Sequence, residues 1–283
     1  MWNLLSILLI LSMLRATNSL TALVTGSTDG IGKHTSRRLL QSGYKVLIHG
    51  RSQSRVDATI SELQRYGEVE SFTHDISTVS GCLALTSAVK SSHESLDLLI
   101  NNAGVFCDTY SLSSCGLETT FAVNVLAPFT ITRELLPLLQ KTKNSRIINV
   151  SSISQNDGPR TISPSTVLNS VFQNRETWNK YATYGISKRL IAMYSLNLSK
   201  KFDSPTVMSC DPGTVNTKML LEGWGPCGID IKDANNEYDL ATKELGEDDH
   251  GQYFFGQRVH PDVESVENQE ELISLLEELS TKY

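Results

Sequence analysis

The sequence predicts a single α/β domain built on a doubly wound parallel sheet. Short apolar runs alternate along the chain with longer segments of helical pattern, and this alternation is typical of parallel strands joined by crossover helices. At 283 residues the chain is long enough for one large domain, and no interior linker rich in Pro, Gly and Ser marks a second. We therefore assign residues 20–283 to one domain and treat the apolar segment 1–19 separately.

The predicted strands are short runs of apolar and β-branched residues. They lie at 21–25, 45–49, 69–74, 96–100, 146–150, 206–210 and 252–255. Helices are expected from the glycines at 30–32 to 40, from 57, from 117 to 140 with an interruption at Pro128, from 184 to about 201, at 237–243 and at 268–279. Ligands bind at the C-terminal edge of such a sheet, so the residues that directly follow each strand are the first candidates for a site.

A glycine-rich turn follows the first strand. Its sequence is Gly26-Ser27-Thr28-Asp29-Gly30-Ile31-Gly32. Glycines let the backbone turn tightly and approach a ligand, while the N-terminus of the next helix presents N–H groups to a phosphate. The order strand, loop, helix therefore predicts a dinucleotide-phosphate site, although the spacing is not G-x-G-x-x-G. A glycine turn without a ligand is the alternative.

Charged residues follow the next two strands, where the adenosine end of a dinucleotide should lie. An acidic residue after the second strand would accept the ribose hydroxyls of NAD, whereas Arg51 favours the additional phosphate of NADP. The sequence thus favours NADP(H) over NAD(H), with an ordinary loop arginine as the alternative. Asp75, after the third strand, either bonds the adenine or caps the next helix.

Polar residues follow the fourth and sixth strands and interrupt the longest helix. Asn101-Asn102-Ala103-Gly104 predicts a tight turn under a cofactor, or simply turn-stabilising asparagines. Asn124 stands among apolar residues, where an unpaired amide costs about 1–3 kcal/mol and must therefore find partners. The segment 211–217 either holds the nicotinamide end of a cofactor or only turns the chain.

A tyrosine and a lysine one helical turn apart point to proton chemistry. Of the nine tyrosines, only Tyr184 has a lysine four residues later, Lys188. On a helix the two share a face, and we expect the cation to lower the pKa of the phenol. Ser151 and Ser152 end the fifth strand at the ligand edge, and the polar insertion 155–180 that follows predicts a lid. Chance spacing on a solvated helix face is the alternative.

Taken in order, these motifs resemble the short-chain dehydrogenase/reductase family over about residues 21–257, and its Rossmann-type fold. The matching motifs are Thr25-Gly26-x-x-x-Gly30-Ile31-Gly32, Asn101-Asn102-Ala103-Gly104, Asn124, Ser152, Tyr184-x-x-x-Lys188 and Pro212-Gly213. The insertion and the strand at 252–254 are most similar to the retinol-dehydrogenase-like branch. Ser152, in place of Ser151, is the serine that this resemblance selects.

The resemblance implies a catalytic tetrad of Asn124, Ser152, Tyr184 and Lys188. Tyr184 would exchange a proton with the substrate oxygen, and Lys188 would lower its pKa and bind the nicotinamide ribose. Ser152 would donate to the substrate oxygen, and Asn124 would hold a proton-relaying water chain. The cofactor-binding residues that it implies are Gly26, Ser27, Asp29, Gly30, Ile31, Gly32, Arg51, Asp75, Ile76, Asn102, Ala103, Gly104, Tyr184, Lys188, Pro212, Gly213, Val215 and Thr217.

Together these features predict an NADP-dependent oxidoreductase that interconverts a carbonyl and an alcohol on a lipophilic substrate. A cofactor-binding regulatory protein without turnover is the alternative from another class. A sugar-nucleotide epimerase is a third, but the short region after the sixth strand leaves little room for a nucleotide-sugar domain. A homo-oligomer is compatible with the sequence.

Composition excludes other classes of partner. A net charge of −6 argues against nucleic-acid binding, which needs a basic face. The six histidines lack metal-type spacing, so we predict no metal site. The five cysteines contain no C-x-x-C, and free thiols are expected in place of a disulfide framework.

The N-terminus has an uncharged, mostly apolar run, residues 2–14, before Arg15. It is shorter than the roughly 20 residues that span a bilayer. A signal peptide usually has a basic residue before its apolar core, and none precedes this run. We therefore favour an interfacial anchor on a membrane or lipid droplet, facing the cytosol, over secretion. An apolar extension packed on the domain is the alternative.

Overall fold

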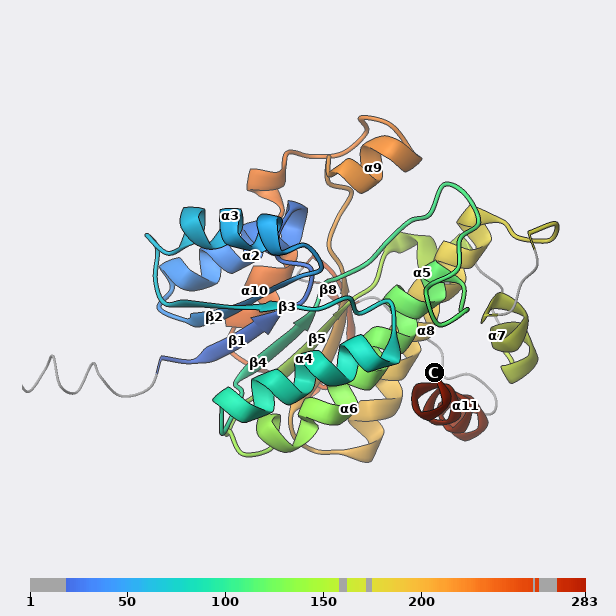
Figure 1. The fold of residues 1–283 in the computed structure, drawn as a ribbon. Coiled ribbons are helices and arrows are strands. Elements are labelled where there is room, and N and C mark those ends of the chain that lie inside the picture. Colours follow the sequence, from blue (N-terminus) through green and yellow to red (C-terminus); the bar gives the residue numbers. More distant parts are fainter. Residues whose placement is uncertain (1–18, 158–161, 172–174, 257, 260–268) are drawn as a thin grey trace, which may run out of the picture.

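The computed structural model describes residues 19–157, 162–171, 175–256, 258–259 and 269–283. This part of the chain contains one eight-stranded sheet of order β3-β2-β1-β4-β5-β6-β7-β8 (Figure 1). The strands are β1 Thr21–Val24, β2 Lys45–Gly50, β3 Val69–Thr73, β4 Leu98–Asn101, β5 Arg146–Val150, β6 Thr206–Asp211, β7 Tyr253–Phe255 and β8 Arg258–Val259. All neighbours pair in parallel except β7 with β8. The predicted doubly wound sheet is confirmed, with β8 as an unexpected addition.

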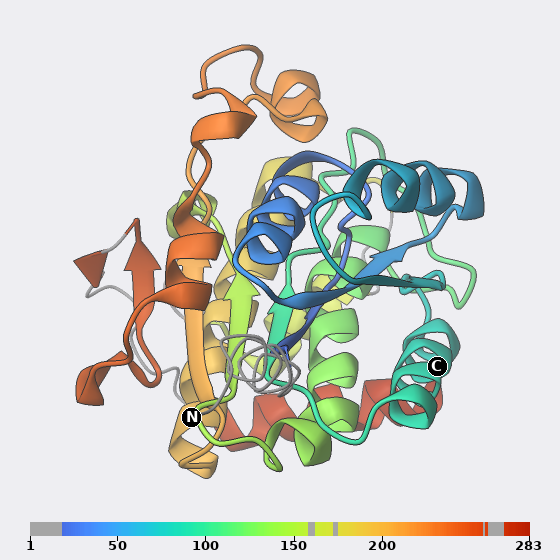
Figure 2. The ribbon, with the colours of Figure 1, turned by 90° about the vertical axis from the view of Figure 1, so that its left-hand side faces the viewer.

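Helices cover both faces of the sheet (Figure 2). On one face lie α2 Gly30–Gln41, α3 Gln53–Leu63 and α10 Asn236–Thr242; on the other lie α4 Val79–Ser92, α6 Ala127–Leu139 and α8 Lys180–Lys201. Successive residues of β1 alternate between the two cores, because Ala22 and Val24 pack with α2 and Leu23 packs with the opposite layer. The strand order reverses between β1 and β4, so a crevice for ligands is expected at the C-terminal ends of these strands.

The helix predicted over 117–140 is divided into three pieces. They are α5 Thr119–Phe121, the π-helix η1 Ala122–Leu126, and α6. Pro128 lies at the start of α6 and has no N–H to give to the carbonyl of Asn124 four residues earlier, so the α-helical ladder cannot continue there. A π-turn absorbs that break, and such turns are frequent at functional sites.

The insertion does not place its helix over the ligand edge. After the 3-10 turn η2 Ile153–Asp157, helix α7 Pro164–Val171 packs against the C-terminal helix α11 Gln269–Lys282, with Val167 in the core. For α7 the expected lid is therefore wrong, since this helix lies against α11 and buries Val167 in the core. Residues 158–161 and 172–174 lie outside the described part.

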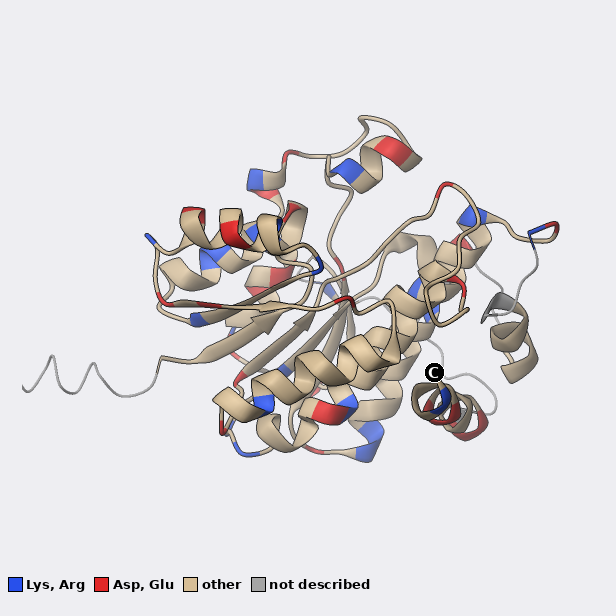
Figure 3. Ribbon diagram, in the orientation of Figure 1, with Lys and Arg blue, Asp and Glu red and all other residues tan. Residues whose placement is uncertain are grey.

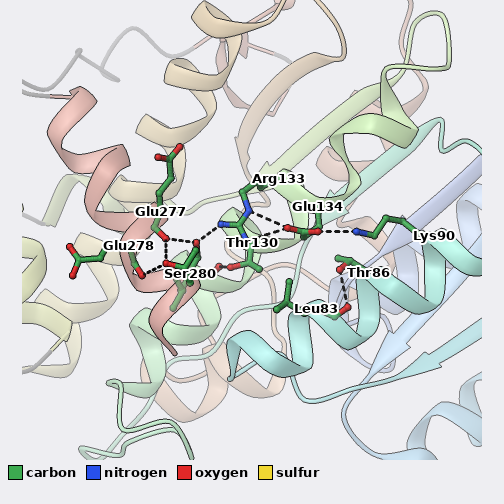
Figure 4. A network of polar contacts seen from close by, with 11 residues as sticks. Leu83, Thr86, Lys90, Thr130, Arg133, Glu134, Glu277, Glu278 and Ser280 are labelled. Atoms are coloured by element: carbon green, nitrogen blue, oxygen red, sulfur yellow. Dashed lines mark hydrogen bonds and ion pairs between the residues drawn. The ribbon is translucent and has the colours of Figure 1, made fainter.

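Helix α11 is also fixed to the helical layer by polar contacts (Figure 4). Arg133 on α6 donates to Ser280 Oγ and pairs with Glu134, whose carboxylate lies 2.8 Å from Lys90 Nζ on α4. On its apolar face α11 buries Leu272, Leu276 and Leu279. The C-terminal helix thus belongs to the domain core.

Among the described residues, one stretch is apolar and long enough to cross a membrane. This stretch is Thr119–Leu139, and 78% of its most apolar 18-residue window is buried within the domain. Burial of this kind is typical of a core helix, and this stretch covers one face of the sheet. The predicted anchor, residues 2–14, lies outside the described residues.

Candidate active site

The glycine-rich loop packs tightly on the turn after β4. Gly26 has φ +65°, and a Cβ there would lie 2.9 Å from Ala103 Cα; at Gly32 a Cβ would lie 2.2 Å from Asn102 Nδ2. Asn102 Nδ2 donates to Thr25 O at 2.7 Å. Only glycine fits these two positions, so the two motifs form one unit at the crevice between β1 and β4.

Asn101 and Asn102 have different tasks. Asn101 is buried and donates through Nδ2 to Thr132 Oγ1 at 2.9 Å and Asn149 Oδ1 at 2.8 Å, which ties β4 to α6 and β5. Asn102, in contrast, fixes the glycine loop. Ala103 N adds a bond to Thr25 Oγ1 at 3.0 Å. The turn-stabilising alternative therefore describes Asn102, whereas Asn101 joins β4 to its neighbours.

His49 supports the glycine loop and was missed in the sequence. It is buried on β2, where Nδ1 accepts from Gly26 N at 3.2 Å and Nε2 lies 3.1 Å from His74 O. Burial lowers its pKa to about 4, so the ring is neutral and these two contacts fix its tautomer. A histidine inside an apolar strand was the available signal, because a buried imidazole must find partners.

Tyr184, Ser152 and Lys188 come together at the C-terminal end of β5. Tyr184 is buried on α8 and forms a hydrogen bond with Ser152, while Lys188 Nζ donates to Val150 O at 3.0 Å and lies 5.6 Å from the Tyr184 ring centroid. Ser151 is occupied elsewhere, because its Oγ donates to Lys188 O at 2.7 Å. Of the two serines, Ser152 is the one beside the phenol.

Burial dominates the protonation of this group. It raises the pKa of Tyr184, and the hydrogen bond with Ser152 offsets the shift only in part. Burial likewise lowers the pKa of Lys188 to about 8. The expectation that Lys188 lowers the pKa of Tyr184 is therefore wrong in its net direction, because removal from water penalises the charged form of both groups.

Asn124 lies in the π-helix and has found the partners that its burial requires. Its Oδ1 accepts from Val105 N at 2.8 Å, and its Nδ2 donates to Val105 O at 2.9 Å and Ser187 Oγ at 3.1 Å. Asn124 thus joins the loop after β4 to helix α8, at Ser187, the residue that precedes Lys188.

An aromatic cluster covers the Tyr184 side of the site. Phe106 and Trp224 contact the Tyr184 ring, and Tyr181 packs on Phe106 and Trp224, with ring centroids 4.4 to 5.8 Å apart across the cluster. Trp224 caps helix α9 Lys218–Gly223, and Met219 Sδ on that helix lies 3.8 Å from the Tyr184 hydroxyl. Trp178, in the insertion, is not part of this cluster, because its ring packs on Tyr110 with the centroids 6.1 Å apart. Helix α9 stands above the sheet edge in Figure 1.

The segment after β6 returns to the glycine loop. Gly213 follows Pro212 with φ +92°, and its N–H donates to Asp211 Oδ1. Val215 is buried, and Thr217 caps α9 through a bond from Leu220 N at 3.3 Å. A Cβ at Gly30 would lie 3.4 Å from Thr217 Cγ2, so the segment predicted to hold the nicotinamide end lies against the glycine loop.

At the adenosine end, Arg51 is exposed just past β2, and among the described residues its side chain has no hydrogen bond or ion pair. Asp75 is exposed and accepts from Ser77 N at 3.0 Å, while Ile76 is buried. The cap of α4 is Thr78, which accepts from Gly81 N at 3.0 Å. The alternative that Asp75 caps this helix is therefore wrong.

A cavity of about 320 Å³ lies beside this end of the site, on the outer side of α2. It is lined by Asp29, Gly30, Lys33, His34, Arg37, Glu62, Leu63, Ile231 and Lys232. None of the predicted tetrad lines it. The cavity therefore adjoins the glycine loop and is separate from Tyr184.

The model of the short chain dehydrogenase family matches residues 20–164, just over half of the chain. That segment holds the glycine loop, Asn124 and Ser152, and the geometry above adds Tyr184 and Lys188 to them. The chain belongs to the short chain dehydrogenase family.

Relatives of this short chain dehydrogenase include a polyprenol dehydrogenase and a retinol dehydrogenase. Polyprenol dehydrogenase of Mus musculus is 28% identical over 215 residues, covering 72% of this chain and 62% of the relative. Retinol dehydrogenase 12 of Bos taurus is 29% identical over 209 residues, covering 72% and 64%. The match thus spans less than two thirds of the length of these relatives. It supports the retinol-dehydrogenase-like branch.

Solved structures share the fold. Salutaridine reductase from Papaver somniferum aligns with a TM-score of 0.71 at 19% identity, over 83% of this chain and 99% of that one. The Pseudomonas aeruginosa RhlG/NADP active-site complex aligns with a TM-score of 0.59 at 24% identity, over 93% and 90%. These likenesses confirm the Rossmann-type architecture.

The residues of this short chain dehydrogenase fit a dinucleotide. At Gly26 and Gly32 side chains are excluded by Ala103 and Asn102, so the loop backbone lies bare at the sheet edge. The first turn of α2 adds N–H groups without intrahelical acceptors, which suit a pyrophosphate. The polar groups of Tyr184, Ser152 and Lys188 lie at the same edge.

Proposed function

We propose that this protein is an NADP(H)-dependent oxidoreductase that interconverts a carbonyl and an alcohol on a lipophilic substrate. The observation that carries the proposal is the meeting of Tyr184, Ser152 and Lys188 at the end of β5. A proton donor, a second hydroxyl and a cation are the groups that a carbonyl reduction needs, because negative charge develops on the substrate oxygen.

A reduced nicotinamide, when bound, supplies the hydride that the carbonyl carbon accepts. Tyr184 gives its hydroxyl proton to the carbonyl oxygen, and Ser152 donates a hydrogen bond to the same oxygen. Alcohol oxidation runs the same steps in reverse. Because burial raises the pKa of Tyr184, the phenol holds its proton at neutral pH, which suits a general acid.

Lys188 and Asn124 act around this proton transfer. The Lys188 ammonium would stabilise the phenolate as it forms and would hold the nicotinamide ribose. Asn124 fixes the loop at Val105 to α8 through Ser187. Its Oδ1 has one lone pair beyond the bond from Val105 N, and this could accept from a water that returns the proton to the tyrosine.

Arg51 supports the preference for NADP(H). Its exposed guanidinium is free of partners among the described residues and stands just past β2. Arginine binds phosphate through paired hydrogen bonds, and no acidic residue follows Gly50 to accept ribose hydroxyls. RhlG, which shares the fold, was solved with NADP.

The aromatic cluster supports a lipophilic substrate. Phe106, Tyr181 and Trp224 place apolar rings beside the Tyr184 hydroxyl, and Met219 adds a thioether. Two relatives are named for retinol and polyprenol, which are lipophilic alcohols.

Consumption of NADPH with a panel of lipophilic aldehydes and ketones tests the proposal. Tyr184→Phe should lower kcat by roughly 10²- to 10⁴-fold, because it removes the proton donor and leaves the ring in place. Its dissociation constant for NADPH should stay unchanged. Tyr181→Phe, a neighbour in the same cluster, is the matched control and should keep kcat. Near wild-type turnover in Tyr184→Phe would contradict the assignment.

A further inference from the structure

The acidic residue of the glycine loop holds an arginine from a different element. Asp29 Oδ1 accepts from Gly30 N at 2.8 Å, and its Oδ2 lies 2.7 Å from Arg55 Nη2. The two side chains are 62% and 55% exposed. Exposed ion pairs contribute little to folding stability. The position of this pair, beside the predicted adenosine site, therefore matters more than its strength.

Three elements meet where this pair lies. Arg55 is in the first turn of α3, four residues after Arg51. A Cβ at Gly50 would come within 2.5 Å of Thr28 Cγ2 and 3.0 Å of Val56 Cγ2, so the end of β2, the glycine loop and α3 are in close contact. The Asp29–Arg55 pair bridges the glycine loop and α3 beside the end of β2, where Arg51 lies.

We propose that Arg55, oriented by Asp29, is a second determinant of 2′-phosphate binding beside Arg51. This inference rests on the proposed NADP(H) preference. One guanidinium nitrogen contacts Asp29, and a guanidinium carries five N–H donors in a planar fork. Arg55 can therefore keep its carboxylate partner and offer other donors to a phosphate.

This arrangement explains how the loop can carry an acid at a phosphate site. Alone, Asp29 would repel a phosphate dianion. Asp29 is paired with Arg55 and lies near Arg51, so the three side chains together carry a net positive charge. The pairing also restricts the rotamers of Arg55 before the ligand binds, which lowers the entropy that Arg55 loses on binding. Asp29 is a positioning residue in this scheme, and Arg55 contacts the ligand.

Direct binding of two nucleotides tests the inference without turnover. Adenosine 2′,5′-bisphosphate and adenosine 5′-monophosphate differ only in the 2′-phosphate, and calorimetry on the full chain gives both dissociation constants. Arg55→Ala should weaken binding of the bisphosphate about 10-fold or more, as loss of a charge-assisted contact predicts, and change the monophosphate less than about 2-fold. Asp29→Asn should weaken the bisphosphate in the same direction but less, and the double variant should match Arg55→Ala.

Arg65→Ala is the matched control, because Arg65 is an exposed arginine beyond the other end of α3, over the Tyr66 ring. An Arg65→Ala loss equal to that of Arg55→Ala would reduce the effect to general charge and overturn the inference. Tighter binding of the bisphosphate by Asp29→Asn would also overturn the inference, because it would show that Asp29 competes with the phosphate for Arg55. Selectivity lost in Arg51→Ala but retained in Arg55→Ala refutes the role of Arg55 alone, whereas no selectivity in the wild-type chain refutes the NADP(H) preference itself.

Discussion

At the scale of single residues, the site gathers several ionisable side chains that are almost removed from solvent. Tyr184, Lys188 and Glu237 are each less than 8% exposed. Glu237, on α10, accepts from Thr35 Oγ1 at 3.1 Å, and its Oε1 has no hydrogen-bond partner among the described residues. Burial raises the pKa of this carboxyl to about 7, with Thr35 and Lys188 acting in the other direction.

The Glu237 shift predicts how stability depends on pH. An acid whose folded pKa lies above its unfolded value, here about 7 against 4.5, contributes stability that is full below pH 4.5 and lost as pH rises through 7. The loss approaches about 3 kcal/mol. The pKa of Lys188 is lowered to about 8, so its contribution to stability changes with pH mainly above pH 8. It therefore affects the range from pH 4.5 to 7 little.

Glu237→Gln should therefore lack this decline, so its unfolding free energy should increase relative to that of the wild type as the pH is raised from 5 to 8. The comparison between the two proteins is needed because His49, whose pKa is lowered to about 4, makes the stability of both rise with pH in the lower part of this range. Urea unfolding of both proteins at the two pH values measures it. Glu278→Gln, at an exposed position of α11, is the control and should retain the pH dependence of the wild type. The same pH dependence in Glu237→Gln and wild type would show that the pKa of this carboxyl is not raised in the folded protein.

At the scale of elements, the sequence predicted what local pattern controls. The six strands from β1 to β6, and the helices over 184–201, 237–243 and 268–279, follow from apolar runs and periodicity, and the structure confirms them within a few residues. The glycine loop and Asn124 were found because glycine spacing and a polar residue in an apolar helix are visible in one dimension. All five cysteines are free, as predicted from the absence of a C-x-x-C motif.

Features that depend on tertiary contacts escaped the sequence. His49 matters because Gly26 and His74 lie beside it, and the bond between Asp29 and Arg55 spans two elements. The packing position of α7 depends on α11, which lies about a hundred residues later in the chain. β8 is two residues long, too short for any alternating pattern.

Helix α9 is the element expected to recognise the substrate, and Trp224 is its main apolar contact. Trp224 touches Phe106, Tyr181 and Tyr184, so Trp224→Ala removes a large apolar ring from the cluster that we propose to contact a lipophilic substrate. We expect kcat/KM for a lipophilic carbonyl to fall roughly 10-fold or more, with an unchanged dissociation constant for NADPH. Leu221→Ala, exposed on the same helix, is the control. An equal loss in both variants would indicate that α9 was disordered and not that Trp224 recognises substrate.

At the scale of the whole molecule, charge is dispersed. Figure 3 shows Lys and Arg interspersed with Asp and Glu over the helices of both layers. With a net charge of −6, the described part offers no evident basic face for an anionic surface. For attachment to a membrane through apolar contact, the apolar run at residues 2–14 is the candidate in the sequence.

This run predicts how the full chain distributes between membrane and solution. It contains Leu4, Leu5, Ile7, Leu8, Leu9, Ile10, Leu11 and Leu14. At ~25 cal/mol per Å², burying these side chains in an interface contributes several kcal/mol before ordering costs. The full chain should therefore sediment with microsomes or lipid droplets, and deletion of residues 2–18 should release it while turnover on a water-soluble carbonyl persists. The variant with Leu8→Asp and Leu9→Asp keeps the length of the chain and should also be released. A full chain wholly in the soluble fraction, or a secreted form starting near Leu20, would disprove the anchor and leave the chemistry of Tyr184 unaffected.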